Sequence, residues 1–336
     1  MPQFNIKQMK ILIVCSGNAP DFEFTRNQAF IYDQIEAIKS VAPEVHFETF
    51  FIQGRGFIGY LKSRKKLLLK IRQSNFHCLH AHFSLSGLLA NLQTRLPVVA
   101  TFHGSDINFF KNRIISFIVG LLSRRTIYVS TKLLNKAVCV SKTKSTVIPC
   151  GVNFDLFKPV SQADARVKLG LSFDKTYILF SSGFYIKVKN YSLAKKALEK
   201  LSRFNVEILE LQGYSRIDVA LLFSAVDVAL MTSFSEGSPQ FIKEAMACNC
   251  PVVSTDVGDI CEVFGNTEGC YLTSFDPQDV AEKIEKALAY GKRTNGRKNI
   301  QHLDNAVIAE KIIQVYRSAV KSDRICDDSC DNLSNS

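Results

Sequence analysis

The sequence predicts an α/β protein built from two doubly wound domains, each a parallel sheet with helices on both faces. At 336 residues, the chain is too long for one ordinary α/β domain and suits two. Short apolar runs alternate with longer segments of helical periodicity in both halves, which is the pattern of parallel sheets. A hydrophobic fraction of 46% is enough for two buried cores.

The expected elements follow one another in the same order in both halves. In the first half, strands are expected at residues 11–15, 45–51, 77–80, 98–102 and 137–140, with a helix at 28–40. In the second half, strands are expected at 177–181, 206–211, 226–231, 251–254 and 270–272, and helices at 192–203, 217–225, 240–248 and 277–290.

A linker separates the halves. Residues 146–160, TVIPCGVNFDLFKPV, hold the prolines, glycine and asparagine typical of one. We therefore expect an N-terminal domain at residues 1–155 and a C-terminal domain at 156–321, with a last helix at 306–321 that could pack back toward the N-terminal domain. Residues 322–336 are expected to form a disordered tail.

Positive charge is concentrated in the first 150 residues. They hold 20 basic and 7 acidic residues, and the remainder holds 22 and 24, so that +13 and −2 sum to the net charge of +11. A basic half indicates a polyanionic partner. Nucleic acid is the weaker candidate, because aromatic interleaving, a helix-turn-helix signature and a zinc module are missing from the sequence.

An anionic membrane surface is the stronger candidate. Residues 61–72, LKSRKKLLLKIR, indicate either an ordinary amphipathic helix with a solvated face or a membrane contact. The apolar run at 114–122, bracketed by lysine and arginine, favours the membrane.

The compartment follows from the cysteines and the apolar runs. Neither close cysteine pair has zinc-knuckle spacing, which predicts reduced thiols in a cytoplasmic protein. The first apolar run, residues 11–15, is too short for a signal peptide, and no segment reaches the roughly 20 apolar residues of a membrane span. The protein is thus expected in the cytoplasm, where it could lie on the inner face of the membrane.

Residues 233–259, SFSEGSPQFIKEAMACNCPVVSTDVGD, are the most informative segment. They predict a strand, a polar loop and a helix, with Ser238 as N-cap and Pro239 at the first helical position. The free amides of Gln240 and Phe241 would then lie at the positive end of the helix, which suits a diphosphate.

Two glutamates bracket this phosphate position. Glu236 lies just ahead of the helix, and Glu244 lies six residues past the cap, about 9 Å along the axis. The carboxylates could hold hydroxyls on either side of a diphosphate, which is the layout of a nucleotide-sugar. On spacing alone, a loop acid and a solvent-facing helix residue are the simpler explanation.

The same segment resembles the donor-site motif of the family-4 retaining glycosyltransferases, in which Glu, seven residues, Glu, an alanine-rich helix, a Pro-Val-Val strand and a glycine turn follow one another. HAHFSLSG, TFHGSD, VIPCGVNFDLFKP and VKNYSLAKKALEKL resemble further segments of the family, in the family's order and over nearly the whole chain. The subgroup that it most resembles is the polysaccharide-assembly type of the teichuronic-acid glycosyltransferases.

The resemblance implies a GT-B fold, with two Rossmann-like domains facing an interdomain cleft. It also implies retaining transfer of a sugar from a nucleotide-sugar donor to a glycan or lipid-linked acceptor in cell-surface polysaccharide assembly. Neither a metal nor another cofactor is expected, since no Asp-x-Asp pair appears in the motifs.

The resemblance also implies roles for individual residues. Glu244 would bind the ribose hydroxyls, and Glu236 would contact the transferred sugar. Lys189 would neutralise the diphosphate leaving group, and His103 would touch the donor sugar near the reacting carbon. The remaining donor-binding candidates are Gly237, Ser238, Pro239, Gln240, Phe241, Lys187 and Gly17.

The chain departs from the family pattern at Phe184, where an arginine usually stands five residues before the lysine. Lys187 could substitute for this phosphate cation. The departure predicts an altered donor geometry, weaker catalysis or an inactive protein. The loop after the first strand, CSGNAP, has a single glycine, Gly17.

Other residues leave alternatives open. His80 and His82, at a strand end, suit a structural role or an acceptor contact equally. Asp106 could orient an acceptor hydroxyl or cap the following turn. Two further functions are a non-catalytic nucleotide-sugar-binding protein and a nucleotide-sugar epimerase of the same fold. The sequence leaves open the nucleotide, the sugar, the acceptor and the oligomeric state.

Overall fold

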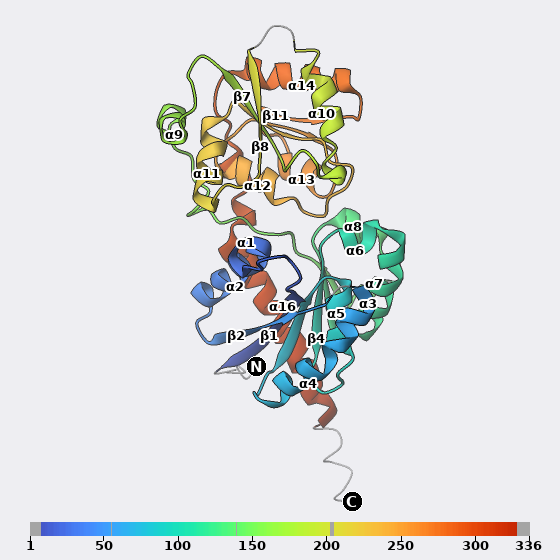
Figure 1. Cartoon of the computed structure of the whole chain (residues 1–336). Helices are drawn as coiled ribbons and strands as arrows, with labels where there is room; N and C mark the ends of the chain where they lie inside the picture. The colour runs from blue at the N-terminus through green and yellow to red at the C-terminus, as the bar shows by residue number, and fades with distance from the viewer. Residues whose placement is uncertain (1–7, 55, 139, 202–204, 328–336) are drawn as a thin grey trace, which may run out of the picture. The chain divides into compact units, whose positions relative to one another are not determined.

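The computed structural model describes residues 8–54, 56–138, 140–201 and 205–327. The chain divides into unit 1, Met1–Pro149 with Ala306–Ser336, and unit 2, Cys150–Asn305. Each unit is a parallel sheet covered by helices (Figure 1). The segment after Pro149 belongs to unit 2, six residues earlier than the expected boundary, because Val152 donates to the carbonyl of Leu303 at 2.9 Å and pairs with Asp304.

The sheet of unit 1 has the strand order β2-β1-β3-β4-β5-β6, and its pairs are parallel. Because β2 and β3 flank β1 on opposite sides, the order reverses between β1 and β3, where ligands of such sheets usually bind. The strands are β1 (Met9–Ser16), β2 (Val45–Ile52), β3 (Cys78–His82), β4 (Val98–Phe102), β5 (Arg125–Tyr128) and β6 (Ser145–Val147).

Helices cover both faces of this sheet. Alternate residues of β1 point to opposite faces, so that Ile11 and Ile13 pack with α2 and α16, and Leu12 and Val14 pack with α4 and α5 (Figure 1). The helices are α1 (Phe24–Asn27), α2 (Ala29–Val41), α3 (Gly56–Lys62), α4 (Arg64–Arg72), α5 (Ser84–Asn91), α6 (Ser105–Asn108), α7 (Phe110–Leu122), α8 (Thr131–Lys136) and α16 (Asn305–Asp327).

The strand expected at residues 137–140 is wrong. Ala137 is the C-cap of α8, and the side chain of Val138 is half exposed. The sheet continues instead through β5 and β6, which have four and three residues and carry too few apolar side chains for a clear signal. The helix α16 extends to Asp327, and the rest of the expected tail lies outside the described residues.

The sheet of unit 2 has the strand order β11-β10-β9-β7-β8, again with parallel pairs. Its order reverses between β7 and β9. The strands are β7 (Thr176–Phe180), β8 (Val206–Glu210), β9 (Val228–Met231), β10 (Val252–Thr255) and β11 (Cys270–Thr273). The helices are α9 (Gln162–Leu169), α10 (Tyr191–Leu198), α11 (Arg216–Ala225), α12 (Gln240–Ala247), α13 (Ile260–Phe264), α14 (Pro277–Tyr290) and α15 (Gly296–Asn299), with the 3₁₀ turns η1 (Lys187–Lys189) and η2 (Gln301–Leu303).

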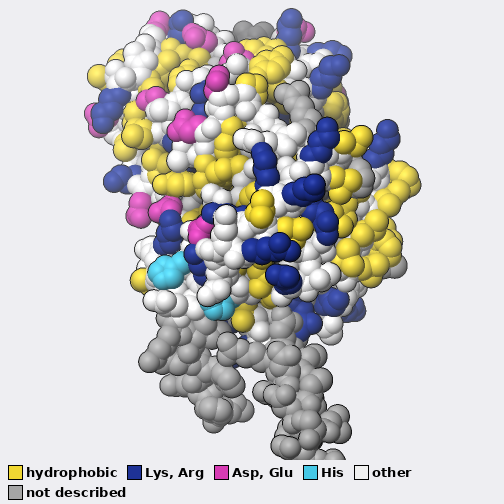
Figure 2. Space-filling model, turned by 60° about the horizontal axis from the view of Figure 1, so that its bottom comes forward, with side chains coloured by type: hydrophobic (Ala, Val, Ile, Leu, Met, Phe, Trp, Pro, Cys, Tyr) yellow, Lys and Arg dark blue, Asp and Glu magenta, His cyan; other side chains and the backbone are white. Residues whose placement is uncertain are grey.

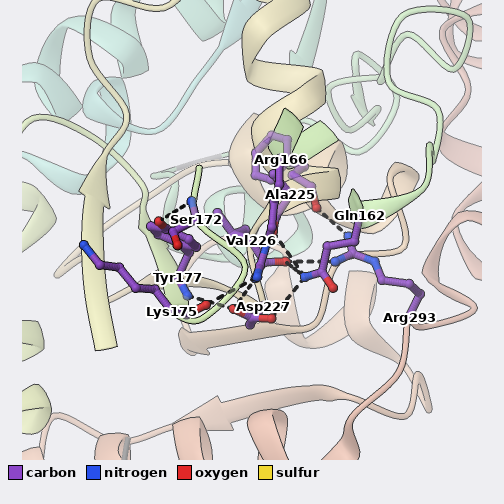
Figure 3. A network of polar contacts seen from close by, with 10 residues as sticks. Gln162, Arg166, Ser172, Lys175, Tyr177, Ala225, Val226, Asp227 and Arg293 are labelled. Atoms are coloured by element: carbon purple, nitrogen blue, oxygen red, sulfur yellow. Dashed lines mark hydrogen bonds and ion pairs between the residues drawn. The ribbon is translucent and has the colours of Figure 1, made fainter. Parts of the chain in front are cut away.

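A polar network fixes the amino ends of these strands (Figure 3). The carboxylate of Asp227 accepts hydrogen bonds from the amide of Tyr177 at 2.7 Å, from Arg166 at 2.9 Å and from Gln162 at 3.0 Å. Arg293 donates to backbone carbonyls beside it. This network ties β7 to Asp227, the residue ahead of β9, and so fixes the two strands at their amino ends. The candidate site lies at the carboxyl ends of the same strands.

Candidate functional site

The loops after β7 and β9 are bonded to each other at the carboxyl ends of the strands. The hydroxyl of Thr232, just after β9, donates to the carbonyls of Lys189 at 3.1 Å and Asn190 at 2.9 Å. The amide of Phe234 donates to the carbonyl of Val188 at 2.9 Å. Asn190 has a left-handed backbone, with φ of 55°, which ends η1 and starts α10. These bonds set η1 against the loop that leads to α12.

Two of the predicted catalytic residues meet in this arrangement. The ammonium of Lys189 lies 2.7 Å from Oε1 of Glu236, and their side chains are 22% and 17% exposed. They come from loops that flank the point where the strand order reverses, which is the ligand-binding position of such sheets. A charge-assisted bond at this distance holds the two side chains in place ahead of α12.

The start of α12 differs from the expectation. Pro239, not Ser238, is the N-cap, and the cap makes no side-chain hydrogen bond. The hydroxyl of Ser238 instead donates to Asp259 at 2.6 Å and accepts from Lys243 and from the amide of Cys150. Ser238 is therefore used to anchor the loop, because a buried ion pair lies directly beneath it.

That ion pair was missed by sequence reasoning. The ammonium of Lys243 is 0% exposed and lies 2.9 Å from Asp259, which is 3% exposed. Lys243 also donates to the carbonyl of Cys150 at 2.9 Å, so all three of its protons have acceptors. A lysine between Ile242 and Glu244 looks solvent-facing, but it lies three and four positions from the buried Met246 and Ala247, which was the available signal.

The first turn of α12 offers backbone donors and carries no acidic side chain of its own. Amides of a first turn have no partner within their helix, and no acidic side chain lies in this one. Gln240 is half-buried, whereas Phe241 is buried against Phe223 with ring centroids 5.2 Å apart, so Phe241 offers only its backbone. Glu244 lies half-buried one turn further along the helix.

Glycines allow the loop to pack closely. Gly237 and Pro239 are buried, and Gly258 packs directly on them. Gly258 has a φ of +61°, and a Cβ there would lie 2.6 Å from the carbonyl oxygen of Gly237. A side chain at position 258 would therefore displace the loop that carries Glu236.

The remaining residues of the β7 loop show what replaces the family arginine. The ring of Phe184 stacks on Tyr191, with centroids 3.9 Å apart and planes at 17°, at the edge of the core of unit 2. Lys187 is exposed on the same 3₁₀ turn as Lys189. Phe184 thus serves packing, and the cations of this loop are the two lysines.

In unit 1, the candidate residues gather at the carboxyl ends of β1, β3 and β4. Gly17 follows β1 and donates to the carbonyl of Ile52 at 2.9 Å, and a Cβ there would lie 2.8 Å from that of Phe51. His82 ends β3, and His103 follows β4. Nδ1 of His82 lies 2.9 Å from Nε2 of His103, so one ring donates to the other.

Burial keeps these imidazoles neutral. It lowers the pKa of His103 to about 3 and that of His82 well below its usual value, and it lowers the pKa of His80 to about 3 as well. His80 lies between the hydroxyls of Tyr316 and Thr101, each at 2.7 Å from a ring nitrogen. Of the two roles expected for His80, these contacts fit the structural one.

Asp106 is buried, and both of its carboxylate oxygens accept from backbone amides. Oδ1 accepts from Ser84 at 2.6 Å, and Oδ2 accepts from His103 at 2.8 Å. Burial raises the pKa of this carboxyl, and the amides oppose that shift. Asp106 thus fixes the loop that carries His103 instead of capping the following turn, because both donor amides precede it in the chain. Within the described residues, no group of three or more His, Cys, Asp or Glu side chains could hold a metal ion.

Two Rossmann-like units match the GT-B fold, and both family models that match the chain describe glycosyltransferases, so the class of protein is a GT-B glycosyltransferase. The family model described as Glycosyltransferase Family 4 matches residues 9–156, and the model described as Glycosyl transferases group 1 matches residues 179–290. The chain belongs to the family-4 glycosyltransferases.

Individual relatives agree with this assignment. The chain is 26% identical over 235 residues to the Bacillus subtilis protein described as a putative teichuronic acid biosynthesis glycosyltransferase, TuaC, covering 62% of this chain and 60% of TuaC. It is 22% identical over 318 residues to the Campylobacter jejuni N,N'-diacetylbacillosaminyl-diphospho-undecaprenol alpha-1,3-N-acetylgalactosaminyltransferase, covering 81% and 83% of the two chains. The fold is similar to that of sucrose-phosphate synthase from Thermosynechococcus elongatus, with a TM-score of 0.78 at 19% identity over 94% of this chain and 100% of that one.

Proposed function

We propose that this protein transfers a glycosyl group from a nucleotide-sugar to a glycan or lipid-linked acceptor in cell-surface polysaccharide assembly, with retention of configuration and without a metal. The Lys189–Glu236 pair beside the start of α12 carries the proposal. The relatives support its setting, since one is named for teichuronic acid biosynthesis and another for a diphospho-undecaprenol acceptor.

The donor diphosphate would lie against the first-turn amides of α12 and the ammonium of Lys189. As the bond from C1 of the sugar to the diphosphate breaks, negative charge grows on the leaving oxygen, and these groups stabilise it. Glu244 would accept from the ribose hydroxyls, and Glu236, held in place by Lys189, would accept from hydroxyls of the sugar. The role of His103 at the sugar stays a prediction from the resemblance.

Retention requires attack on the face that the diphosphate leaves. In the proposed step, an acceptor hydroxyl oxygen forms the new bond to C1, and its proton passes to the departing diphosphate. The products are the glycosylated acceptor and a nucleoside diphosphate. Glu236 is not assigned as a covalent nucleophile, because the proposed same-face step passes through no glycosyl-enzyme intermediate.

One observation supports a second candidate, a protein that binds a nucleotide-sugar without transferring it. The ring of Phe184 is committed to stacking on Tyr191, so this position supplies no cation for the leaving group. Under this alternative, Lys189 and the helix start would be sufficient for binding but not for catalysis.

The test uses the purified full-length chain with radiolabelled UDP-, GDP-, ADP- and dTDP-sugars and undecaprenyl-diphosphate-linked saccharides as acceptors. Transfer by the native protein, lost in Lys189→Ala and unaffected by a chelator, supports the proposal. The anomeric configuration of the product, measured by NMR, must match that of the donor; inversion contradicts the mechanism. Donor binding without product supports the non-catalytic candidate, and loss of the donor without an acceptor supports epimerase or hydrolase chemistry.

A further inference from the structure

Helix α7 presents a row of large apolar side chains to solvent. Phe110 is 73% exposed, Ile114 56% and Leu121 55%. They recur at intervals of three or four residues, so they share one face of the helix. We call this face the outer stripe, and it consists of Phe110, Ile114, Ile118, Leu121 and Leu122.

The packing of α7 explains why the stripe faces outward. The residues that α7 buries are Ser116 and Val119. The hydroxyl of Ser116 donates to the carbonyl of Asp106 at 2.9 Å, and α5 approaches so closely that a Cβ on Gly87 would lie 2.7 Å from Val119. A helix that served only the core of its own unit would bury its bulkiest side chains. Here the close approach of α5 leaves them outside.

The surroundings of the stripe are positively charged. Residues 49–154 contain 16 lysines and arginines and a single acidic residue, Asp106. Asp106 is 2% exposed and is held by backbone amides, so it does not offset the charge at the surface. Lys111 and Arg113 lie on α7 itself, and the ammonium of Lys144 lies 3.3 Å from the carbonyl of Leu121. Figure 2 shows hydrophobic side chains gathered beside a belt of lysine and arginine.

We propose that the outer stripe of α7 inserts into the interfacial layer of an anionic membrane, with α7 lying in the plane of the bilayer. Thirteen residues give a helix of about 20 Å, which suits such an in-plane contact. The neighbouring cations would contact lipid phosphates. A second copy of this chain fits the stripe less well, because it would bring two positive surfaces together.

This geometry changes the role of residues 61–72. Leu67 and Ile71 of α4 are buried in the core, so α4 is an ordinary amphipathic helix in its packing. Its lysines and arginines would add attraction to the anionic surface, and Leu69, at 56%, is its one large apolar side chain that is exposed. Within the described residues, no helix has the length and apolar character to cross a bilayer, so the proposed contact is peripheral. The proposal does not depend on the proposed function.

The experiment is cosedimentation of the full-length chain with vesicles of phosphatidylcholine, with and without phosphatidylglycerol, at low and high salt. The native protein should bind the anionic vesicles, and salt should weaken the binding. The variant Phe110→Ser/Leu121→Ser should bind at least about tenfold more weakly. The control is Phe173→Ser/Ile217→Ser, which removes side chains of unit 2 that are 62% and 67% exposed, and it should bind like the native protein.

Several outcomes would overturn the proposal. The native chain could fail to bind anionic vesicles, or the α7 variant could bind as well as its control. Loss of a concentration-dependent dimer in the α7 variant, measured by sedimentation velocity, would assign the stripe to a second copy instead. Because the replaced side chains are exposed, circular dichroism should give the same melting temperature for both variants.

Discussion

The buried pair of Lys243 and Asp259 makes a strong prediction about unit 2. Lys243→Met removes the cation that lies 2.9 Å from a carboxylate that is 3% exposed, and Oδ1 of that carboxylate already has no hydrogen-bond partner in the described part of the chain. At 2.9 Å, the gross attraction is about 6 kcal/mol for an effective dielectric constant of 20. Breaking such a pair from one side should lower the free energy of unfolding by about 3–5 kcal/mol.

The assay is urea unfolding followed by far-UV circular dichroism, because the chain contains no tryptophan. The matched control is Lys283→Met, which breaks a pair with Asp279 at 3.7 Å between side chains 26% and 30% exposed. That change should cost no more than about 0.5 kcal/mol. The double variant Lys243→Met/Asp259→Leu should recover much of the loss, since no charge then remains buried. A Lys243→Met cost within about 1 kcal/mol of the control would refute the reasoning.

Three further predictions concern the site and its support. Lys189→Ala should lower kcat by about 100- to 1,000-fold in the transfer assay, and Lys187→Ala by less than tenfold; the reverse order would move the phosphate cation to Lys187. Below the unfolded pKa of 6.5, the unfolded state binds a proton that His80, with its pKa of about 3, does not, so stability falls as pH falls. The unfolding free energy should therefore drop by about 2 kcal/mol less between pH 7 and pH 5 in His80→Gln than in the native protein. An equal drop in both proteins would contradict the burial argument. Gly258→Ala should cost roughly 1–3 kcal/mol in urea unfolding and weaken donor binding, because its Cβ meets the carbonyl of Gly237; a native-like variant would show that the loop yields freely.

The sequence predicts the elements best where local signals agree. The helix at residues 277–290 matches α14 at both ends, because Asp276 caps it, Pro277 starts it and Gly291 ends it with a φ of 63°. The strand at residues 98–102 matches β4, a short buried run. The strands β5 and β6 were missed because strands of four and three residues leave almost no periodicity to detect.

In the candidate site, the sequence likewise predicts the features that belong to a motif and misses those that depend on contacts between distant segments. The resemblance brought Lys189 and Glu236 into one site, and the structure places them 2.7 Å apart. The use of Ser238 as a cap was wrong because its hydroxyl is taken by other partners, among them the amide of Cys150 and the carboxylate of Asp259, which are distant in sequence. The spacing of Lys243 and Asp259 in the sequence does not indicate an ion pair, and most lysines are exposed. Such contacts depend on how β10 and α12 meet, which a local pattern does not specify.

The most direct test of the donor site is a thermal-shift screen of the purified chain against UDP, GDP, ADP, dTDP and their sugar conjugates. A ligand at 100 times its Kd should stabilise the native state by about 2.7 kcal/mol. We expect a clear rise in melting temperature with one nucleotide, lost in Glu244→Ala and kept in Glu268→Ala, a control at an exposed glutamate of the same unit. No rise with any of them, or a rise that Glu244→Ala leaves intact, would contradict the assignment of the donor site to the start of α12.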